Sequence, residues 1–347
     1  MSGPAARTEA RSTRVGWGAL SFGLAAVLGA ALLGAVVGPA GLEPISVIAA
    51  ILDLLPGVSI DSGLTDVETN ILFEIRLPRV VLGAIVGATL AVAGAAYQGV
   101  FRNPLADPYL LGVAAGAGLG ATAAFAVSGD TNWLAPFAFI GGLAAVVATY
   151  ALGRSVGRRS ATSLILAGVA VSAFATAVQT YLLQQNVETL REVYAWILGR
   201  LTTVGWGQVG QLVPYALVAM GVLFVGRRML DVLSIGDDEA KALGMSVARV
   251  RGVVVLSATL ATAAAVSVSG LIGFVGIIVP HTIRIIFGWS YRVIIPLSIL
   301  FGAAFLMVAD VAARTIISPA ELPIGVVTAF FGAPFFLLVL RTMRGPT

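Results

Sequence analysis

The chain has 347 residues, of which 58% are hydrophobic and 11% are charged, with 41 glycines, no cysteine and a formal net charge of +4. A mean hydropathy of +0.98 is typical of a chain that crosses a membrane several times, and it argues against a soluble domain. The absence of cysteine excludes disulfides and thiolate metal sites, so the sequence carries no signal of redox compartment.

Ten stretches are apolar and near the length of about 20 residues that a helix needs to cross the hydrocarbon. Because a backbone in lipid must satisfy its own hydrogen bonds, we predict an all-α membrane protein with ten transmembrane helices. A single transmembrane domain would span 15–340, between a tail at 1–14 and a tail at 341–347. The ten segments are, roughly, Val15–Gly38, Pro78–Gln98, Tyr109–Ser128, Leu134–Gly153, Ala161–Leu183, Val209–Gly226, Gly252–Ile272, Gly273–Gly288, Val293–Ala309 and Leu322–Leu340.

The basic residues predict the orientation of these segments. With both termini in the cytoplasm, only five of the 21 lysines and arginines lie on the outer side, and the other sixteen lie inside, as the positive-inside rule requires. The net positive charge is therefore a signal of topology, and we do not expect a nucleic-acid partner. The five outer residues are Arg76, Arg79, Arg191, Arg200 and Arg314.

The first segment follows Arg7, Arg11 and Arg14, as the apolar part of a signal peptide would. Its apolar run is too long for that role, so we expect an uncleaved first span. The next outer segment contains an apolar patch at Ile45–Leu55 that is too short to span, and we expect a short helix at the membrane interface.

Small residues and helix breakers recur within the spans. Gly112, Gly116 and Gly120 share one helical face, which indicates close helix packing within one subunit more than a transport function. Proline-containing runs at 102–108, 270–281 and 321–325 bend or end helices at membrane depth, where irregular backbone survives only inside protein or along a cavity.

The outer segment at 184–208 mixes amides, charges and aromatic side chains. It is either a solvated loop with an aromatic anchor or the outer mouth of a translocation path.

The segment Ile235–Met245 is a charged, glycine-bounded helical turn between two apolar spans. A charge at the bilayer centre costs roughly 2.5 kcal/mol or more, so this turn is expected outside the membrane, facing water or a partner. With its flanks it makes a cytoplasmic segment at 227–251. Its candidate contact residues are Gly236, Asp237, Asp238, Glu239, Ala240, Leu243, Gly244 and Met245.

Five motifs in order resemble the iron-chelate and cobalamin permease family of type II ABC importers. Together they extend the resemblance from about residue 76 to residue 340, and five ordered motifs are far more specific than any one. The motifs are RLPR (Arg76–Arg79), QGVFRNPLADP (Gln98–Pro108), GFVGIIVPH (Gly273–His281), ADVAAR (Ala309–Arg314) and ELPIGVVTA (Glu321–Ala329).

The resemblance implies a ten-helix subunit that pairs with a second copy of itself, with two ATPase subunits below and an extracytoplasmic binding protein above. The charged turn then corresponds to the helices that couple the permease to the ATPase, where ATP and Mg²⁺ would bind. The chain contains no phosphate loop of the form GxxxxGK[ST], so it is not expected to be an enzyme or to hold a cofactor.

The resemblance also assigns roles to outer and intramembrane residues. Arg76, Arg79 and Arg314 match positions that dock acidic residues of the binding protein, with pairing to Glu74 and Asp310 in the same chain as the alternative. The path is expected between the two copies, along the fifth and tenth spans. Its candidate residues are Ser172, Thr176, Gln179, Thr180, Gln184, Thr328 and Phe331; hydroxyls bonded back to their own helix are the alternative.

Other classes fit the residues less well. An ion-coupled secondary transporter, the alternative of a different class, would be expected to place charges in mid-span and to show inverted repeats. His281, the single histidine, is a poor metal or haem site by itself, so no metal site is predicted and a structural role is expected. The cargo is expected to be a bulky chelate, with iron-siderophore ahead of haem and cobalamin.

Overall fold

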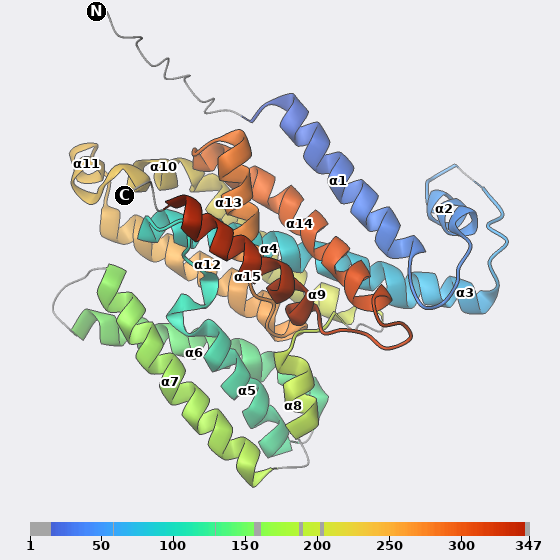
Figure 1. Ribbon diagram of the computed structural model, residues 1–347, viewed down its shortest axis with the longest axis horizontal. Coiled ribbons are helices and arrows are strands. Elements are labelled where there is room, and N and C mark those ends of the chain that lie inside the picture. Colours follow the sequence, from blue (N-terminus) through green and yellow to red (C-terminus); the bar gives the residue numbers. More distant parts are fainter. Residues whose placement is uncertain are drawn as a thin grey trace, which may run out of the picture.

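The computed structural model describes residues 15–57, 59–128, 130–155, 161–186, 190–201 and 205–343, and in these ranges the regular structure is entirely helical (Figure 1). The predicted tail at 1–14, with Arg7, Arg11 and Arg14, lies outside the described residues, as do Arg158, Arg159 and residues 344–347. The helices are α1 (Trp17–Val36), α2 (Pro44–Leu52), α3 (Asp66–Asn70), the π-helix η1 (Ile71–Arg76), α4 (Leu77–Phe101), the 3₁₀-helix η2 (Pro108–Leu111), α5 (Val113–Ser128), the 3₁₀-helix η3 (Thr131–Trp133), α6 (Leu134–Ser155), α7 (Ala161–Gln185), α8 (Leu190–Ile197), α9 (Gly207–Val225), α10 (Arg227–Ile235), α11 (Asp237–Ala242), α12 (Val247–Ser269), α13 (Val275–Phe287), α14 (Tyr291–Thr315) and α15 (Ile324–Met343).

Each of the ten predicted spans coincides with one apolar helix: α1, α4, α5, α6, α7, α9, α12, α13, α14 and α15. By length and composition, seven of these helices in the described part of the chain are able to cross a membrane. The other three, in α5, α13 and α15, are apolar but shorter. Each of these shorter helices is preceded by a stretch of irregular or 3₁₀-helical residues that separates it from the helix before it.

Helix α4 is the central helix of the fold and packs against α9, α12, α13 and α14. Glycines allow two of these approaches: a Cβ at Gly87 would lie 2.2 Å from the carbonyl oxygen of Gly302, and one at Gly94 would lie 2.1 Å from that of Gly276. In lipid, helices associate through such close packing since the hydrophobic effect does not separate one helix from another. The backbone of α4 is thereby fixed against α14 and α13.

Helices α5, α6 and α7 form a second group beside this core (Figure 1). Gly116 and Gly120 face α6, where added Cβ atoms would meet the carbonyl oxygens of Gly141 and Phe137 at 2.3 and 2.1 Å. Gly112 instead ends η2 with a φ of 86° and faces α7. The glycine face therefore serves packing within one subunit, but only two of its three members belong to α5.

The predicted helix breaks are confirmed between α4 and α5, between α12 and α13, and between α14 and α15. In the irregular stretch at 270–274, Tyr109 supplies hydrogen-bond partners for the backbone of Ile272. Its hydroxyl donates to the Ile272 carbonyl at 3.0 Å and accepts from the Ile272 amide at 3.1 Å. Pro280 does not end a helix, because it lies inside α13.

The two segments expected from the sequence to lie outside the membrane contain short helices and not only loop. α2 confirms the short helix expected near Ile45, with Val47 and Ala50 buried and Ile45 exposed. The segment at 184–208 contains α8, which the composition of that segment did not indicate; Val193 is its buried anchor. α2 and α3 lie at one end of the molecule and α11 at the opposite end (Figure 1).

Candidate functional site

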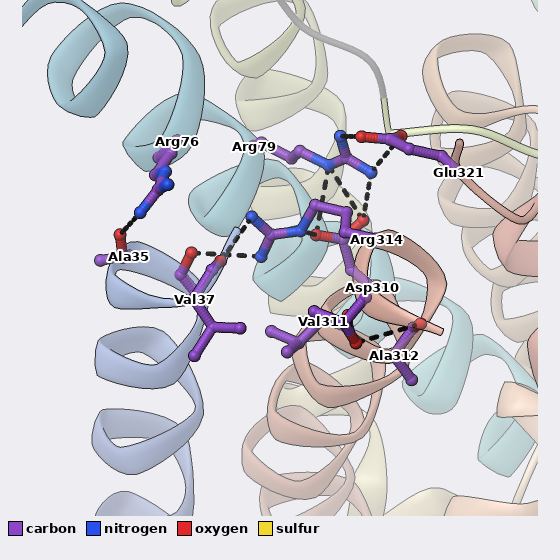
Figure 2. A network of polar contacts seen from close by, with 11 residues as sticks. Ala35, Val37, Arg76, Arg79, Asp310, Val311, Ala312, Arg314 and Glu321 are labelled. Atoms are coloured by element: carbon purple, nitrogen blue, oxygen red, sulfur yellow. Dashed lines mark hydrogen bonds and ion pairs between the residues drawn. The ribbon is translucent and has the colours of Figure 1, made fainter. Parts of the chain in front are cut away.

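At the end opposite α11, Arg79 is the centre of a polar network that joins three helices and a loop (Figure 2). Its Nε donates to Asp310 at 3.0 Å, and its two terminal nitrogens each donate to a separate oxygen of Glu321 at 2.9 Å. The side chain of Asp310 is 3% exposed, whereas that of Glu321 is 36% exposed. The network is therefore buried on its α14 side and reaches the surface only at Glu321.

Arg314 and Arg76 hold the carboxyl end of α1 (Figure 2). Arg314 pairs with Asp310 at 3.0 Å and donates to the carbonyls of Gly34 and Val37, each at 3.1 Å. Arg76 donates to the carbonyls of Ala35, Val36 and Ala40. The last carbonyls of a helix have no partner within it and carry partial negative charge, so the arginines cap and neutralise this end.

This geometry bears on the docking role expected for the three arginines. All three side chains are buried and donate within the chain, which favours the intrachain alternative for Asp310. Glu74, the other expected partner, makes no ion pair among the described residues; its carbonyl accepts from the amide of Gly205. Contact with a binding protein stays a prediction.

At the other end, the charged turn is confirmed as a short helix, α11, packed against α10 and α12. Its acidic residues face different ways. Asp237 pairs inward with Arg102 at 3.3 Å and with Arg251 at 2.9 Å. Asp238 is 92% exposed and pairs with Lys241, whose hydrogen bond lowers the pKa of the Asp238 carboxyl.

The exposed face of this segment includes Glu239, Leu243 and Gly244, while Gly236 and Ala240 are buried and Met245 is half-buried. Glu239 folds back over Gly236, where an added Cβ would lie 1.9 Å from its Oε2. Leu243 is 69% exposed, an apolar side chain in a charged surface. Ile235, at the start of the segment, is 63% exposed as well, so the segment offers carboxylates beside two apolar side chains.

Asp107, in the linker before η2, caps the start of that helix. Its carboxylate accepts from the amide of Tyr109 at 2.7 Å.

The predicted path residues occupy two separate helices. On α7, Thr176, Thr180 and Gln184 are exposed and Ser172 is half-buried, as one accessible stripe requires. The Thr180 hydroxyl donates to the carbonyl of Thr176 at 2.8 Å, as the alternative predicts for a single residue. Gln179 is 9% exposed and faces α5 near Gly118.

On α15, Thr328 is buried and donates to the carbonyl of Gly325, whereas Phe331 is 57% exposed. α15 packs on α13 and α14, and α7 packs on α5 and α6. Within one subunit, α7 and α15, the two helices expected to line the path, therefore pack against different neighbours and not mainly against each other.

Sequence reasoning missed a buried polar cluster near α11. Arg284 is 2% exposed and has no carboxylate at ion-pair distance among the described residues. It donates to Gln98 at 2.9 Å and to the Tyr291 hydroxyl at 3.3 Å, and Gln98 donates to the carbonyl of Gly276 at 3.0 Å. Gln98 and Gly276 lie in two of the quoted motifs, which was the available signal.

His281 lies one turn before this cluster. Its ring meets Phe335 edge-on at 5.9 Å, and its Nδ1 has no hydrogen-bond partner. No group of three or more potential metal ligands occurs in the described ranges.

A bundle of apolar helices with a charged, exposed segment at one end and a buried arginine network at the other defines a polytopic membrane permease. The chain belongs to the FecCD transport family, whose model matches residues 25–342.

Curated relatives and a solved structure agree with this assignment. The chain is 42% identical to the uncharacterised ABC transporter permease YvrB of Bacillus subtilis, over 80% of each chain. It is 42% identical to the cobalamin import permease BtuC of Halobacterium salinarum, over 80% of this chain and 75% of that one. It is 39% identical to the hemin transport permease HmuU of Yersinia pestis, over 80% and 85%.

A metal-chelate type ABC transporter solved in an inward-facing conformation matches with a TM-score of 0.76 at 29% identity, over 91% of this chain and 98% of that one. The predicted family and the all-helical permease fold are confirmed.

Proposed function

We propose that this chain is the membrane-spanning subunit of an ATP-driven ABC importer that carries a bulky metal chelate across a prokaryotic cytoplasmic membrane. The observation that carries the proposal is the match to the FecCD family over residues 25–342, together with the fold of a metal-chelate type transporter. Relatives named for iron chelates, hemin and cobalamin support this class of cargo. We rank iron-siderophore first, haem second and cobalamin third.

ATP hydrolysis is assigned to a separate ATPase that holds ATP and Mg²⁺. The chain has no phosphate loop, and the exposed face of the 227–251 segment supplies a docking element of the expected charge. This assignment places α11 and both termini in the cytoplasm, and the excess of lysine and arginine at that end supports it.

The transport path is assigned to the interface of two copies of the chain, with α7 and α15 lining it. The accessible stripe at Thr176, Thr180 and Gln184 supports this choice, because the rest of the exposed surface of α7 includes apolar residues such as Phe174 and Val169. An apolar path with a few hydroxyls and amides suits a chelate that moves without being stripped of its ligands.

An ion-coupled carrier is the alternative. The described buried carboxylate nearest to such a role is Asp310, and it is neutralised by Arg79 and Arg314 near the outer end of α14. A fixed, doubly paired carboxylate is poorly suited to take up and release a proton.

Uptake by proteoliposomes that hold the purified permease, its ATPase and its binding protein tests the proposal. We expect uptake of a ferric siderophore, or of haemin or cobalamin if those are the cargo, to require ATP and to persist when an uncoupler collapses the ion gradients. Uptake driven by an imposed gradient without ATP would refute it.

A further inference from the structure

Arg200 is an exposed cation held on a fixed backbone at the outer end of the molecule. Its amide donates to the carbonyl of Ser269, at the end of α12, at 2.8 Å. The two residues before it accept from the first residues of α15: Gly199 from Ile324 and Leu198 from Gly325, both at 3.2 Å. The chain that carries Arg200 is therefore bonded on both sides.

Three glycines make this bonding possible. A Cβ at Gly270 would lie 2.0 Å from the carbonyl oxygen of Trp196, and one at Gly325 would lie 2.5 Å from that of Leu198. Gly199 has a φ of 76°, a conformation that residues with a side chain rarely adopt. A backbone in such close contact loses little further freedom when a partner binds its side chain, which lowers the cost of association.

The side chain of Arg200, in contrast, is exposed and has no hydrogen bond or ion pair within the described part of the chain. It lines two neighbouring cavities. One has a volume of about 280 Å³ and also contacts Arg79, Glu321 and Leu322. The other, of about 410 Å³, lies beside α8 and presents Glu192, Gln208 and Gln211.

The charges around these cavities indicate what enters them. In the smaller cavity, two guanidinium groups face one carboxylate, and Arg79 already binds both oxygens of Glu321. Arg200 makes no ion pair with Glu321, nor with Glu192 in the larger cavity, among the described residues. A carboxylate is the group whose geometry a guanidinium fits best. The amides of Gln208 and Gln211 add hydrogen-bond partners beside it.

We propose that Arg200 is a docking residue for the extracytoplasmic binding protein, and that it receives an aspartate or glutamate side chain from that partner at the mouth of the two cavities. The inference rests on the proposed function, since only an importer has this partner. It differs from the role expected for Arg76, Arg79 and Arg314, because those side chains are buried and bonded within the chain, whereas the exposed Arg200 side chain has no bonded partner among the described residues.

The test uses the permease–ATPase complex in nanodiscs and its purified binding protein. Arg200→Ala should weaken binding about threefold and Arg200→Glu about tenfold at 50 mM salt, since an exposed ion pair contributes little and reversing the charge adds repulsion. Both losses should shrink at 500 mM salt because the charges are screened.

Arg191 supplies the matched control. It is also exposed and outside both cavities, so Arg191→Ala and Arg191→Glu should leave the affinity within twofold. Reversing one acidic residue of the binding protein should restore affinity for Arg200→Glu and weaken it for the wild-type complex.

The outcomes separate the inference from the function it rests on. A wild-type complex whose ATP hydrolysis ignores the binding protein overturns the proposed function. A wild-type complex that responds, with Arg200→Glu binding as tightly as Arg191→Glu, overturns the role of Arg200 alone. If Arg200→Glu lowers chelate uptake with unchanged affinity for the binding protein, Arg200 contacts the cargo, and the docking inference is wrong.

Discussion

Asp310→Asn should destabilise the protein far more than Glu321→Gln, although each substitution removes one carboxylate that pairs with Arg79. Asp310 is buried and neutralises two arginines, so Asp310→Asn raises the net charge of the network from about +1 to about +2 without access to water. Removing one partner of a buried ion pair costs about 3 to 5 kcal/mol. Glu321 is partly exposed, and its replacement should cost about 1 kcal/mol.

Equilibrium unfolding in mixed detergent micelles, followed by circular dichroism, measures both changes. The double variant Asp310→Leu, Arg314→Met is the control, because it removes the stranded charge together with its carboxylate. It should recover at least half of the stability that Asp310→Asn loses. If Asp310→Asn unfolds within 1 kcal/mol of the wild type, the network does not hold the fold together, and docking becomes the better reason for its arginines.

Three further predictions concern the charged helix α11, the packing of α4 and the exposed stripe of α7. The double variant Asp238→Lys, Glu239→Lys should reduce co-purification of the ATPase, because both side chains are exposed. Asp237→Asn breaks only the ion pairs with Arg102 and Arg251, so it should leave ATPase attachment intact but speed amide exchange in α11 about two- to fivefold. Equal loss of the ATPase from both variants would contradict this division. Gly87→Ala should destabilise the protein by about 1 to 3 kcal/mol or more, because its Cβ meets the backbone of Gly302, whereas Gly221→Ala, with open space, should not; equal unfolding midpoints would refute the contact. Single cysteines at 176 and 180 should react with a water-soluble thiol reagent and change rate with ATP, while one at 174 should stay unreactive in lipid; uniform labelling around α7 would remove its path assignment.

The sequence was sufficient to predict the ten apolar helices because each is a continuous apolar run near the length of the bilayer, a property of neighbouring residues. It was not sufficient for α8 and α10. α8 has eight residues with one buried anchor, Val193, so its composition resembles that of a loop. α10 follows α9 after the single residue Gly226, and its charges were read as part of one cytoplasmic segment.

The candidate site shows the same limit. Arg79 is recognisable as an outer arginine, but its partners are 231 and 242 residues away, and only the fold brings Asp310 and Glu321 to it. The opposite orientations of Asp237 and Asp238 also depend on Arg102, directly after α4, and on Arg251 in α12. Arg200 lies in no quoted motif, and what distinguishes it is that its side chain has no partner in the part of the chain that the structure describes.

The capping of α1 has a consequence for how the protein is made. α1 packs mostly on α14, and the carbonyl of Gly34 at its carboxyl end receives Arg314 from 280 residues further along the chain. At about 5 to 20 residues per second, the ribosome needs about 14 to 56 s to synthesise that interval. During this time the first helix has been made while its principal neighbour has not, so the nascent chain depends on the insertion machinery or on surrounding lipid to hold α1 until α14 arrives.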